Sequence, residues 1–167
     1  MKLLRLLDFV FKPQYVYAHC DIPCGIYDPH EMQVAAHTIV RMTEMINDLK
    51  ASSDNPDFDE RKKIISQISR LTKVKEEHAE LVKHQVRIIW GDYFKAEHLE
   101  KYKDLHNLVF NIMKQSSKVR QNVDAEGANE LLSMVQKFAA IFWETKGRET
   151  IKVKSGYPTE GEVVLPK

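Results

Sequence analysis

Apolar residues spaced three and four positions apart recur over most of this chain, and this spacing constrains the fold more than any other feature. The first such segment begins at Asp28-Pro29, where Asp suits the N-cap of a helix and Pro its first turn. Glu31 then has the position that completes a capping box. We therefore expect a helix that ends before the turn at 52–56. Its apolar face consists of Met32, Ala35, Ile39, Met42, Ile46 and Leu49.

Three further segments repeat the pattern. The second expected helix runs from near Asp57 to about Trp90, the third from about Glu97 to Arg120, and the fourth ends near Gly147. Because short connections join them and no strand pattern precedes residue 150, the sequence predicts an all-α fold, an up-down four-helix bundle. The expected faces are Ile64, Ile68, Leu71, Val74, His78, Leu81, Gln85 and Ile88; then Leu99, Tyr102, His106, Val109 and Met113; then Leu131, Val135, Phe138 and Phe142.

Charge and hydropathy argue against nucleic-acid binding and against a membrane span. Lys and Arg total 25 and Asp and Glu total 24, so the net charge of +1 argues against nucleic-acid binding. The apolar run Met1–Phe11 is too short, and too interrupted by charge, to span a membrane. The segment Arg148–Lys167 contains two Gly and two Pro, and we expect an extended C-terminal tail, docked on a partner.

Several metal and nucleophile motifs are absent from the sequence. A di-iron bundle needs Glu-x-x-His on two helices, and no His in this chain has Glu three residues before it. There is also no His-Glu-x-x-His, no Gly-x-x-x-x-Gly-Lys and no Gly-x-Ser-x-Gly. The two cysteines, Cys20 and Cys24, are spaced too far apart for a thioredoxin-type Cys-x-x-Cys pair.

The segment His19–Tyr27 has the donors of a square-planar metal site. If cleavage makes His19 the first residue, its amine, the Cys20 amide nitrogen and the Cys20 thiolate close two chelate rings across one planar peptide. Pro23 and Gly25 let the chain turn, so that the Cys24 thiolate takes the fourth position, with the His19 imidazole above the plane. Such sites favour Ni(II) or Cu(II). A small disulfide loop or two buried thiols is the alternative interpretation of the cysteine pair.

The apolar run Met1–Phe11 has two interpretations. It forms either a short amphipathic helix packed on the domain or part of a leader that proteolysis removes. The small residue Ala18 before His19 is compatible with a processing site.

The string His19–Pro29 resembles the N-terminal hook of nickel superoxide dismutases, which has the form His-Cys-Asp-x-Pro-Cys-Gly-x-Tyr-Asp-Pro. The resemblance continues in order through Lys75–Leu81, Trp90–Lys95 and Phe142–Lys146, so it covers about His19–Lys146. It implies a four-helix bundle that carries an N-terminal metal hook. The chain then divides into a removed leader at 1–18, a hook and bundle domain at 19–147, and an extended tail at 148–167.

The resemblance implies an enzyme that converts superoxide into dioxygen and hydrogen peroxide by cycling between Ni(II) and Ni(III). One nickel ion per subunit would be bound by the amine and imidazole of His19, the amide and thiolate of Cys20 and the thiolate of Cys24. We also expect a maturation protease that cuts before His19, a homohexamer and a cytoplasmic location. The alternatives are a non-enzymatic nickel- or copper-binding or metal-delivery bundle, and an interaction scaffold that keeps its leader.

The resemblance also assigns the surroundings of the metal. Tyr27 is expected over the open face, where it holds water or substrate together with Tyr93. Asp21 and Ile26 are expected to shape the pocket through their backbone groups. Lys95 either attracts the anion and positions its neighbours or is an ordinary solvated lysine.

This chain departs from the family pattern at the support of the active-site imidazole. Some members place a Glu on the first helix and an Arg on the second, and the corresponding positions here are Ala35 and His78. We therefore expect His78 to act as the outer hydrogen-bond partner of His19. The alternative is a core histidine that is hydrogen-bonded to a neighbouring carbonyl.

Overall fold

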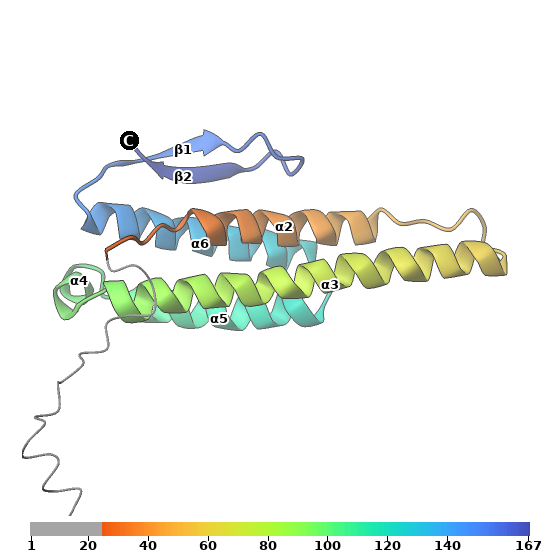
Figure 1. Ribbon diagram of the computed structural model, residues 1–167, viewed down its shortest axis with the longest axis horizontal. Helices are drawn as coiled ribbons and strands as arrows, with labels where there is room; N and C mark the ends of the chain where they lie inside the picture. Colours follow the sequence, from red (N-terminus) through yellow and green to blue (C-terminus); the bar gives the residue numbers. More distant parts are fainter. Residues whose placement is uncertain (1–24) are drawn as a thin grey trace, which may run out of the picture.

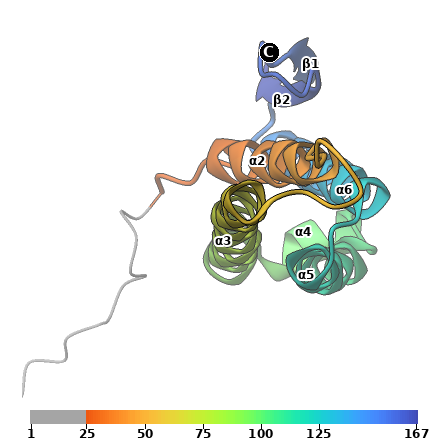
Figure 2. The same ribbon diagram turned by 90° about the vertical axis from the view of Figure 1, so that its right-hand side faces the viewer.

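The computed structural model describes residues 25–167, and its four long helices form a bundle with a small hairpin on one side (Figure 1). Seen from one end, α2, α3, α5 and α6 surround a common interior, and the hairpin lies over α2 and α6 (Figure 2). The predicted all-α four-helix bundle is confirmed, with a two-stranded sheet added. The elements are α2 (His30–Asn47), α3 (Phe58–Ile88), the π-helical turn η1 (Ile89–Tyr93), α4 (Ala96–Lys101), α5 (Leu105–Gln121), α6 (Ala125–Thr145), β1 (Thr150–Lys154) and β2 (Glu162–Pro166).

Helix α2 begins one residue later than its sequence signal indicates. Pro29 occupies the N-cap, and the Asp28 carboxylate accepts a hydrogen bond of 2.7 Å from the His30 amide. The expected capping box does not form, because the Glu31 carboxylate instead accepts a hydrogen bond from the Gln85 side chain. Glu31 therefore joins the start of α2 to the end of α3.

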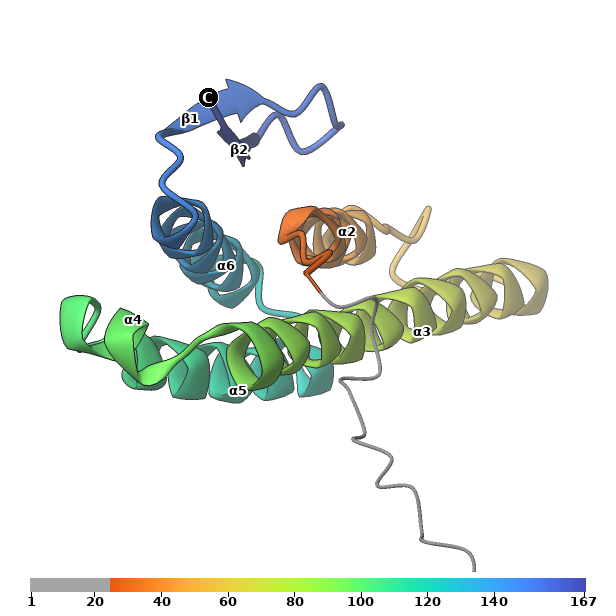
Figure 3. The same cartoon turned by 60° about the vertical axis from the view of Figure 1, so that its left-hand side comes forward.

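Helix α3 starts at the expected N-cap, since the Asp57 side chain accepts a bond from the Glu60 amide. Its buried face is one position away from the expected stripe: Lys75, Ala79, Val82 and Val86 are buried, whereas the expected stripe from Val74 to Ile88 is only partly covered. The N-terminal half of α3 extends past the ends of α5 and α6 (Figure 3). The buried residues of α3 therefore all lie in its C-terminal half.

Lys75 accounts for the unexpected face of α3. Its side chain is 1% exposed, and its ammonium donates to the carbonyls of Val119, Arg120 and Asn122 at the end of α5. The last carbonyls of a helix have no partner within the helix, so Lys75 supplies one from a neighbouring helix. Burial lowers the pKa of Lys75.

The expected third helix is wrong as a single segment. The chain leaves helical geometry at Tyr102 (φ −113°, ψ 67°), so α4 and α5 are separate helices. The Tyr102 hydroxyl donates to the Glu144 carboxylate at 2.8 Å, which fixes this corner against α6. His106, placed on the apolar face by the sequence pattern, is exposed. The buried face of α5 consists of Leu105, Leu108, Val109, Ile112, Ser116 and Val119.

Helix α6 is the helix that the sequence describes best. It runs from Ala125 to Thr145, and the four expected residues from Leu131 to Phe142 are all buried. Asp124 caps its N-terminus by accepting a bond of 2.9 Å from the Gly127 amide. No helix within residues 25–167 is long and apolar enough to cross a membrane.

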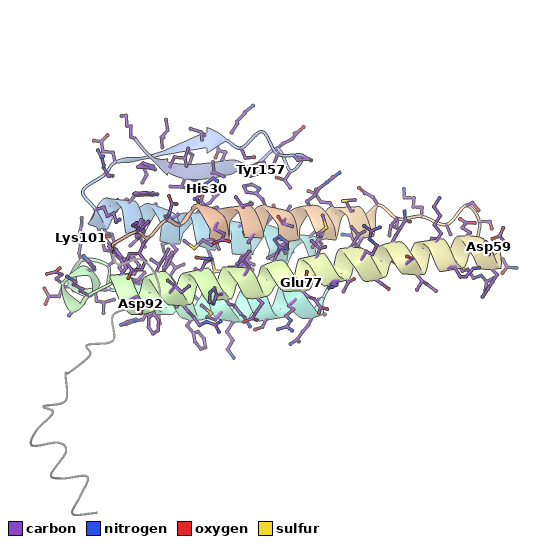
Figure 4. All side chains as sticks on the ribbon, in the orientation of Figure 1. His30, Asp59, Glu77, Asp92, Lys101 and Tyr157 are labelled. Carbon is purple, nitrogen blue, oxygen red and sulfur yellow. The ribbon has the colours of Figure 1, made fainter. Side chains whose placement is uncertain are left out.

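The C-terminal tail is a β-hairpin that docks on its own chain. Strands β1 and β2 pair antiparallel, with Val153 opposite Val163. The Gln33 amide group donates to the Val164 carbonyl at 3.0 Å and accepts from the Val164 N–H at 2.7 Å. His37 Nε2 and the Gln136 amide both donate to the Glu162 carbonyl, and Tyr157 lies against α2 (Figure 4). These contacts join the tail to both α2 and α6.

Candidate functional site

The residues expected to form the site fall into two groups. His19, Cys20, Asp21 and Cys24 lie outside the described residues, so their arrangement stays a prediction. Ile26, Tyr27, His78, Tyr93 and Lys95 are described. Figure 4 labels His30 at the start of α2 and Asp92 in η1, which lie toward the same end of the bundle.

Tyr27 and Tyr93 are brought together by the fold. Tyr27 precedes α2 and is buried, with 9% of its surface exposed. Tyr93 is the last residue of η1. Their ring centroids are 5.8 Å apart at an interplanar angle of 54°. Helices α2 and α3 separate Tyr27 from Tyr93 in the sequence, and the fold brings the two rings into contact.

The geometry of η1 contributes to the position of Tyr93. The Phe94 amide donates to the Ile89 carbonyl at 3.3 Å, the five-residue spacing of a π-helix. Such turns widen the helix locally and often occur at functional sites. Phe94 then leaves the helix in extended conformation (ψ 139°). The widened turn directs Tyr93 toward α6 and Tyr27.

Aromatic rings hold Tyr93 from several sides. We call this group the aromatic cluster; it consists of Tyr27, Tyr93, Phe94, His98 and Phe142. The Tyr93 ring lies 4.8 Å from that of Phe142, 5.2 Å from Phe94 and 5.5 Å from His98, on which it stacks at 16°. These contacts fix the ring plane, because each displacement would lose packing on another side.

One cationic side chain, that of Lys146, lies at the edge of this cluster, and a second lysine, Lys95, follows Phe94 in the sequence. Lys95 is exposed, and its backbone N–H donates to His98 Nδ1 at 3.1 Å. The Lys146 ammonium lies 5.5 Å from the Tyr93 ring centroid and 4.9 Å from that of Phe142. Positive charge near an aromatic face is favourable, and it also attracts small anions to the surface.

A cavity of about 510 Å³ opens beside Tyr27, at the point where the described chain begins. Ile26 lines it and is itself 73% exposed. Since Gly25 follows Cys24 directly, the segment that contains the cysteines joins the bundle at this cavity. The lining residues are Ile26, Tyr27, Asp28, His30, Glu31, Val34, Gln85, Ile88 and Ile89.

The described residues do not form a metal centre of their own. Within residues 25–167 no group of three or more His, Cys, Asp or Glu side chains could hold an ion. Both cysteines of the sequence lie in 1–24, and thiolates with amine and amide nitrogens are suitable donors for nickel. The donor set expected from the sequence therefore fits the metal.

Comparison with known proteins decides the family. The sequence profile of nickel-containing superoxide dismutases matches residues 14–146. The chain belongs to the nickel-containing superoxide dismutase family. The match includes the hook segment, η1 and all four long helices, whereas the hairpin at 150–166 lies beyond it.

Individual nickel superoxide dismutases agree with this assignment. The enzymes of Streptomyces coelicolor and Streptomyces seoulensis are each 37% identical over 142 residues, which cover 84% of this chain and 98% of theirs. A native nickel superoxide dismutase structure superposes with a TM-score of 0.63 at 36% identity, covering 77% of this chain and 99% of its own. An apo structure of the same kind of enzyme gives a TM-score of 0.61 at 33% identity.

His78 has a contact that orients its ring. Its Nδ1 donates to the Val74 carbonyl at 2.8 Å, because a carbonyl oxygen can only accept. In the neutral ring Nε2 is then the acceptor, which is the atom that an outer partner of His19 would use. Ala35, at the other departure from the dismutase pattern, is buried. The carbonyl contact of the alternative interpretation is present, and it is compatible with both roles.

Sequence reasoning missed three residues beside Tyr93: His98, Thr145 and Lys146. His98 follows Lys95 by three residues, a spacing that is compatible with a local cap. Thr145 and Lys146 belong to the Phe142–Lys146 segment that carries the resemblance. Their contact with Tyr93 depends on tertiary structure and leaves no local pattern.

Proposed function

We propose that the mature chain begins at His19 and binds one nickel ion through the His19 amine and imidazole, the Cys20 amide and thiolate, and the Cys24 thiolate. The chain is a nickel-dependent superoxide dismutase: two superoxide ions and two protons become dioxygen and hydrogen peroxide. The bound metal supplies the one-electron redox couple between Ni(II) and Ni(III). The observation that carries the assignment of the site is the Tyr27–Tyr93 pair, 5.8 Å apart, beside the cavity where the hook segment joins the bundle.

The residues of the proposed site have separate tasks. Tyr27 and Tyr93 border the open side of the site, where they hold water or substrate. Asp21 and Ile26 shape the pocket through backbone groups. Lys95 and Lys146 provide positive charge that raises the local concentration of an anionic substrate, although the net charge of the whole chain is only +1.

His78 is the outer partner of the His19 imidazole in this proposal. Its Nδ1–H bond to Val74 leaves Nε2 to accept the proton of that imidazole. We expect His78→Gln to retain nickel and to lower turnover about 10- to 100-fold, as losses of outer partners typically do. His84→Gln, at an exposed position of the same helix, is the matched control. Unchanged turnover and an unchanged nitrogen hyperfine signal in electron paramagnetic resonance would leave His78 as a core residue.

Maturation and assembly follow from the same chemistry. The proposed donor set needs a primary amine at His19, so a protease must remove residues 1–18. Thiolates beside a peroxide-producing centre are open to oxidation unless they are covered. We therefore propose that neighbouring subunits of a homohexamer cover the hook, in the cytoplasm. An active monomer that survives its own product, observed by light scattering, would contradict the assembly.

The decisive experiment combines N-terminal sequencing, nickel content and dismutase activity of the purified native protein. We expect an N-terminus at His19, one nickel per subunit and superoxide-dependent peroxide production. Cys20→Ser and Cys24→Ser should each abolish activity, while the circular dichroism of the described helices, which begin at His30, stays unchanged. Full activity from a chain with residues 1–18 intact, or from either serine variant, would refute the proposed ligands.

A further inference from the structure

Two consecutive hydrogen bonds connect Tyr93 to the last turn of α6. The Tyr93 hydroxyl lies 2.9 Å from Thr145 Oγ1, and Thr145 Oγ1 lies 2.7 Å from the Phe142 carbonyl oxygen. Tyr93 belongs to η1 and Thr145 ends α6, so the pair joins two sides of the bundle. All three residues are at the end where the hook segment enters.

The direction of both hydrogen bonds follows from the number of protons. The Phe142 carbonyl can only accept, so the single hydroxyl proton of Thr145 points to it. That carbonyl needs the bond, because α6 ends here: the Lys146 amide, which would reach Phe142 in a continuing helix, donates to Trp143 at 3.0 Å instead. With its proton used, Thr145 can only accept from Tyr93. The Tyr93 proton therefore points into α6.

We infer that Thr145 is a positioning residue that fixes the Tyr93 hydroxyl as a hydrogen-bond acceptor toward the nickel site. The aromatic cluster already fixes the Tyr93 ring, which leaves rotation about the C–O bond as the remaining freedom of this side chain. Thr145 removes that freedom. The inference rests on the proposed function only in placing Tyr93 beside the superoxide site.

This proton direction limits what Tyr93 does in the reaction. Reduction of superoxide to hydrogen peroxide takes up one electron and two protons. A phenol whose proton is donated to Thr145 accepts a bond from water or from a protonated oxygen species, and it does not donate directly to superoxide. The two protons therefore reach the substrate from water or from another group. Tyr93 orients the donor by accepting its second hydrogen.

The first test uses vibrational spectroscopy on the mature protein, with and without nickel. The ultraviolet resonance Raman doublet of tyrosine reports whether the phenol donates or accepts a hydrogen bond. Thr145→Val removes the hydroxyl at similar volume, and we expect the doublet to change toward that of a non-donating phenol. Thr145→Ser keeps the hydroxyl and should leave the doublet as in the wild type. A Tyr93→Phe background assigns the change, because the other tyrosines remain.

Two outcomes of this test would overturn the inference. One is an unchanged doublet in Thr145→Val, which would mean that Thr145 only caps α6. The other is a change that persists in the Tyr93→Phe background, which would place the effect on another tyrosine. Circular dichroism verifies folding, and Thr145→Ala serves as a second variant if Thr145→Val does not fold.

The second test uses activity of the nickel-loaded protein. We expect Thr145→Val to lower turnover about 2- to 10-fold, the factor that corresponds to losing one neutral hydrogen bond, with nickel content unchanged. Thr145→Ser, which keeps the hydroxyl, should have the turnover of the wild type. Thr145→Val should have no further effect once Tyr93 is replaced by Phe, whereas independent, multiplying losses would contradict the inference. If the wild type shows no dismutase activity, the proposed function fails, and the Raman result still decides the role of Thr145.

Discussion

Replacing the buried Lys75 with Met should destabilise the fold strongly, although it exchanges a buried charge for an apolar side chain. The Lys75 ammonium has three protons and three carbonyl acceptors, those of Val119, Arg120 and Asn122. Met fills most of the space of the lysine stem but donates no hydrogen bond. The end of α5 would then lose three partners at once.

The magnitude follows from the burial of each acceptor. The Val119 bond is buried, and a carbonyl left unpaired there costs about 1–3 kcal/mol. The other two bonds are only partly buried, so water can replace part of what they contribute. Relief of the desolvation of the charge offsets some of the loss. We expect a net decrease of about 2–4 kcal/mol in the free energy of unfolding, within a total of about 5–15 kcal/mol.

Urea denaturation followed by circular dichroism measures this change. With a slope of about 1–3 kcal/mol per molar urea, the midpoint should fall by about 0.7–4 M. Lys73→Met is the control, because the Lys73 side chain is 75% exposed and forms a surface ion pair with Glu77. Its unfolding free energy should stay within about 0.5 kcal/mol of the wild type. Equal midpoints for Lys75→Met and the wild type would refute the argument.

The pH dependence of the stability difference between the wild type and Lys75→Met tests whether burial lowers the pKa of Lys75. Burial lowers the pKa of Lys75 in the folded state below its ordinary value of 10.5. Between these two pKa values the unfolded chain binds more protons at this site, so stability rises with pH. The advantage of the wild type over Lys75→Met should therefore widen as the pH approaches 10.5. A narrowing difference would mean that the contacts raise the pKa of Lys75 instead.

Three further substitutions test the packing around the site. Gln33→Leu leaves both backbone groups of Val164 without their partner, so hydrogen exchange in the hairpin should increase while that of α6 is retained; unchanged exchange would contradict the docking. Ser116→Ala should raise the unfolding free energy by about 0–1 kcal/mol, because the buried Ser116 hydroxyl has no partner within residues 25–167, and a lower melting temperature would argue for a hidden contact. Asp124→Asn keeps the cap of α6 but removes its charge. The hydrogen bond from the Gly127 N–H lowers the pKa of Asp124. The free energy of unfolding of the wild type should therefore exceed that of Asp124→Asn at neutral pH. Acid unfolding experiments should show this difference disappear as the pH falls through the pKa of Asp124.

A helix with regularly spaced apolar residues on its buried face could be predicted from the sequence. Phe138 and Phe142 are spaced four apart and buried, and α6 ends where Gly147 adopts a positive φ of 70°. The face of α3 could not be predicted in this way. A lysine is rarely buried, so the pattern favoured the neighbouring positions Val74 and His78 over Lys75.

The remaining differences depend on contacts between distant residues. Tyr102 carries no local signal for a break, and its bond to Glu144 determines the corner between α4 and α5. The Tyr27–Tyr93 pair was expected from the family resemblance. The Tyr93–Thr145 bond spans 52 positions, and no spacing rule connects two such residues.

The hairpin sets an order on the folding of this chain. Gln33 lies in α2, close to the beginning of the bundle, and its partner Val164 comes 131 positions later. The Gln33 amide group can therefore gain this partner only after all the residues from α2 to β2 have been synthesised. Contacts of such long range slow folding, because the chain must close a large loop before it gains from them. We therefore expect the docking of the hairpin on α2 to be among the last of the described contacts to form.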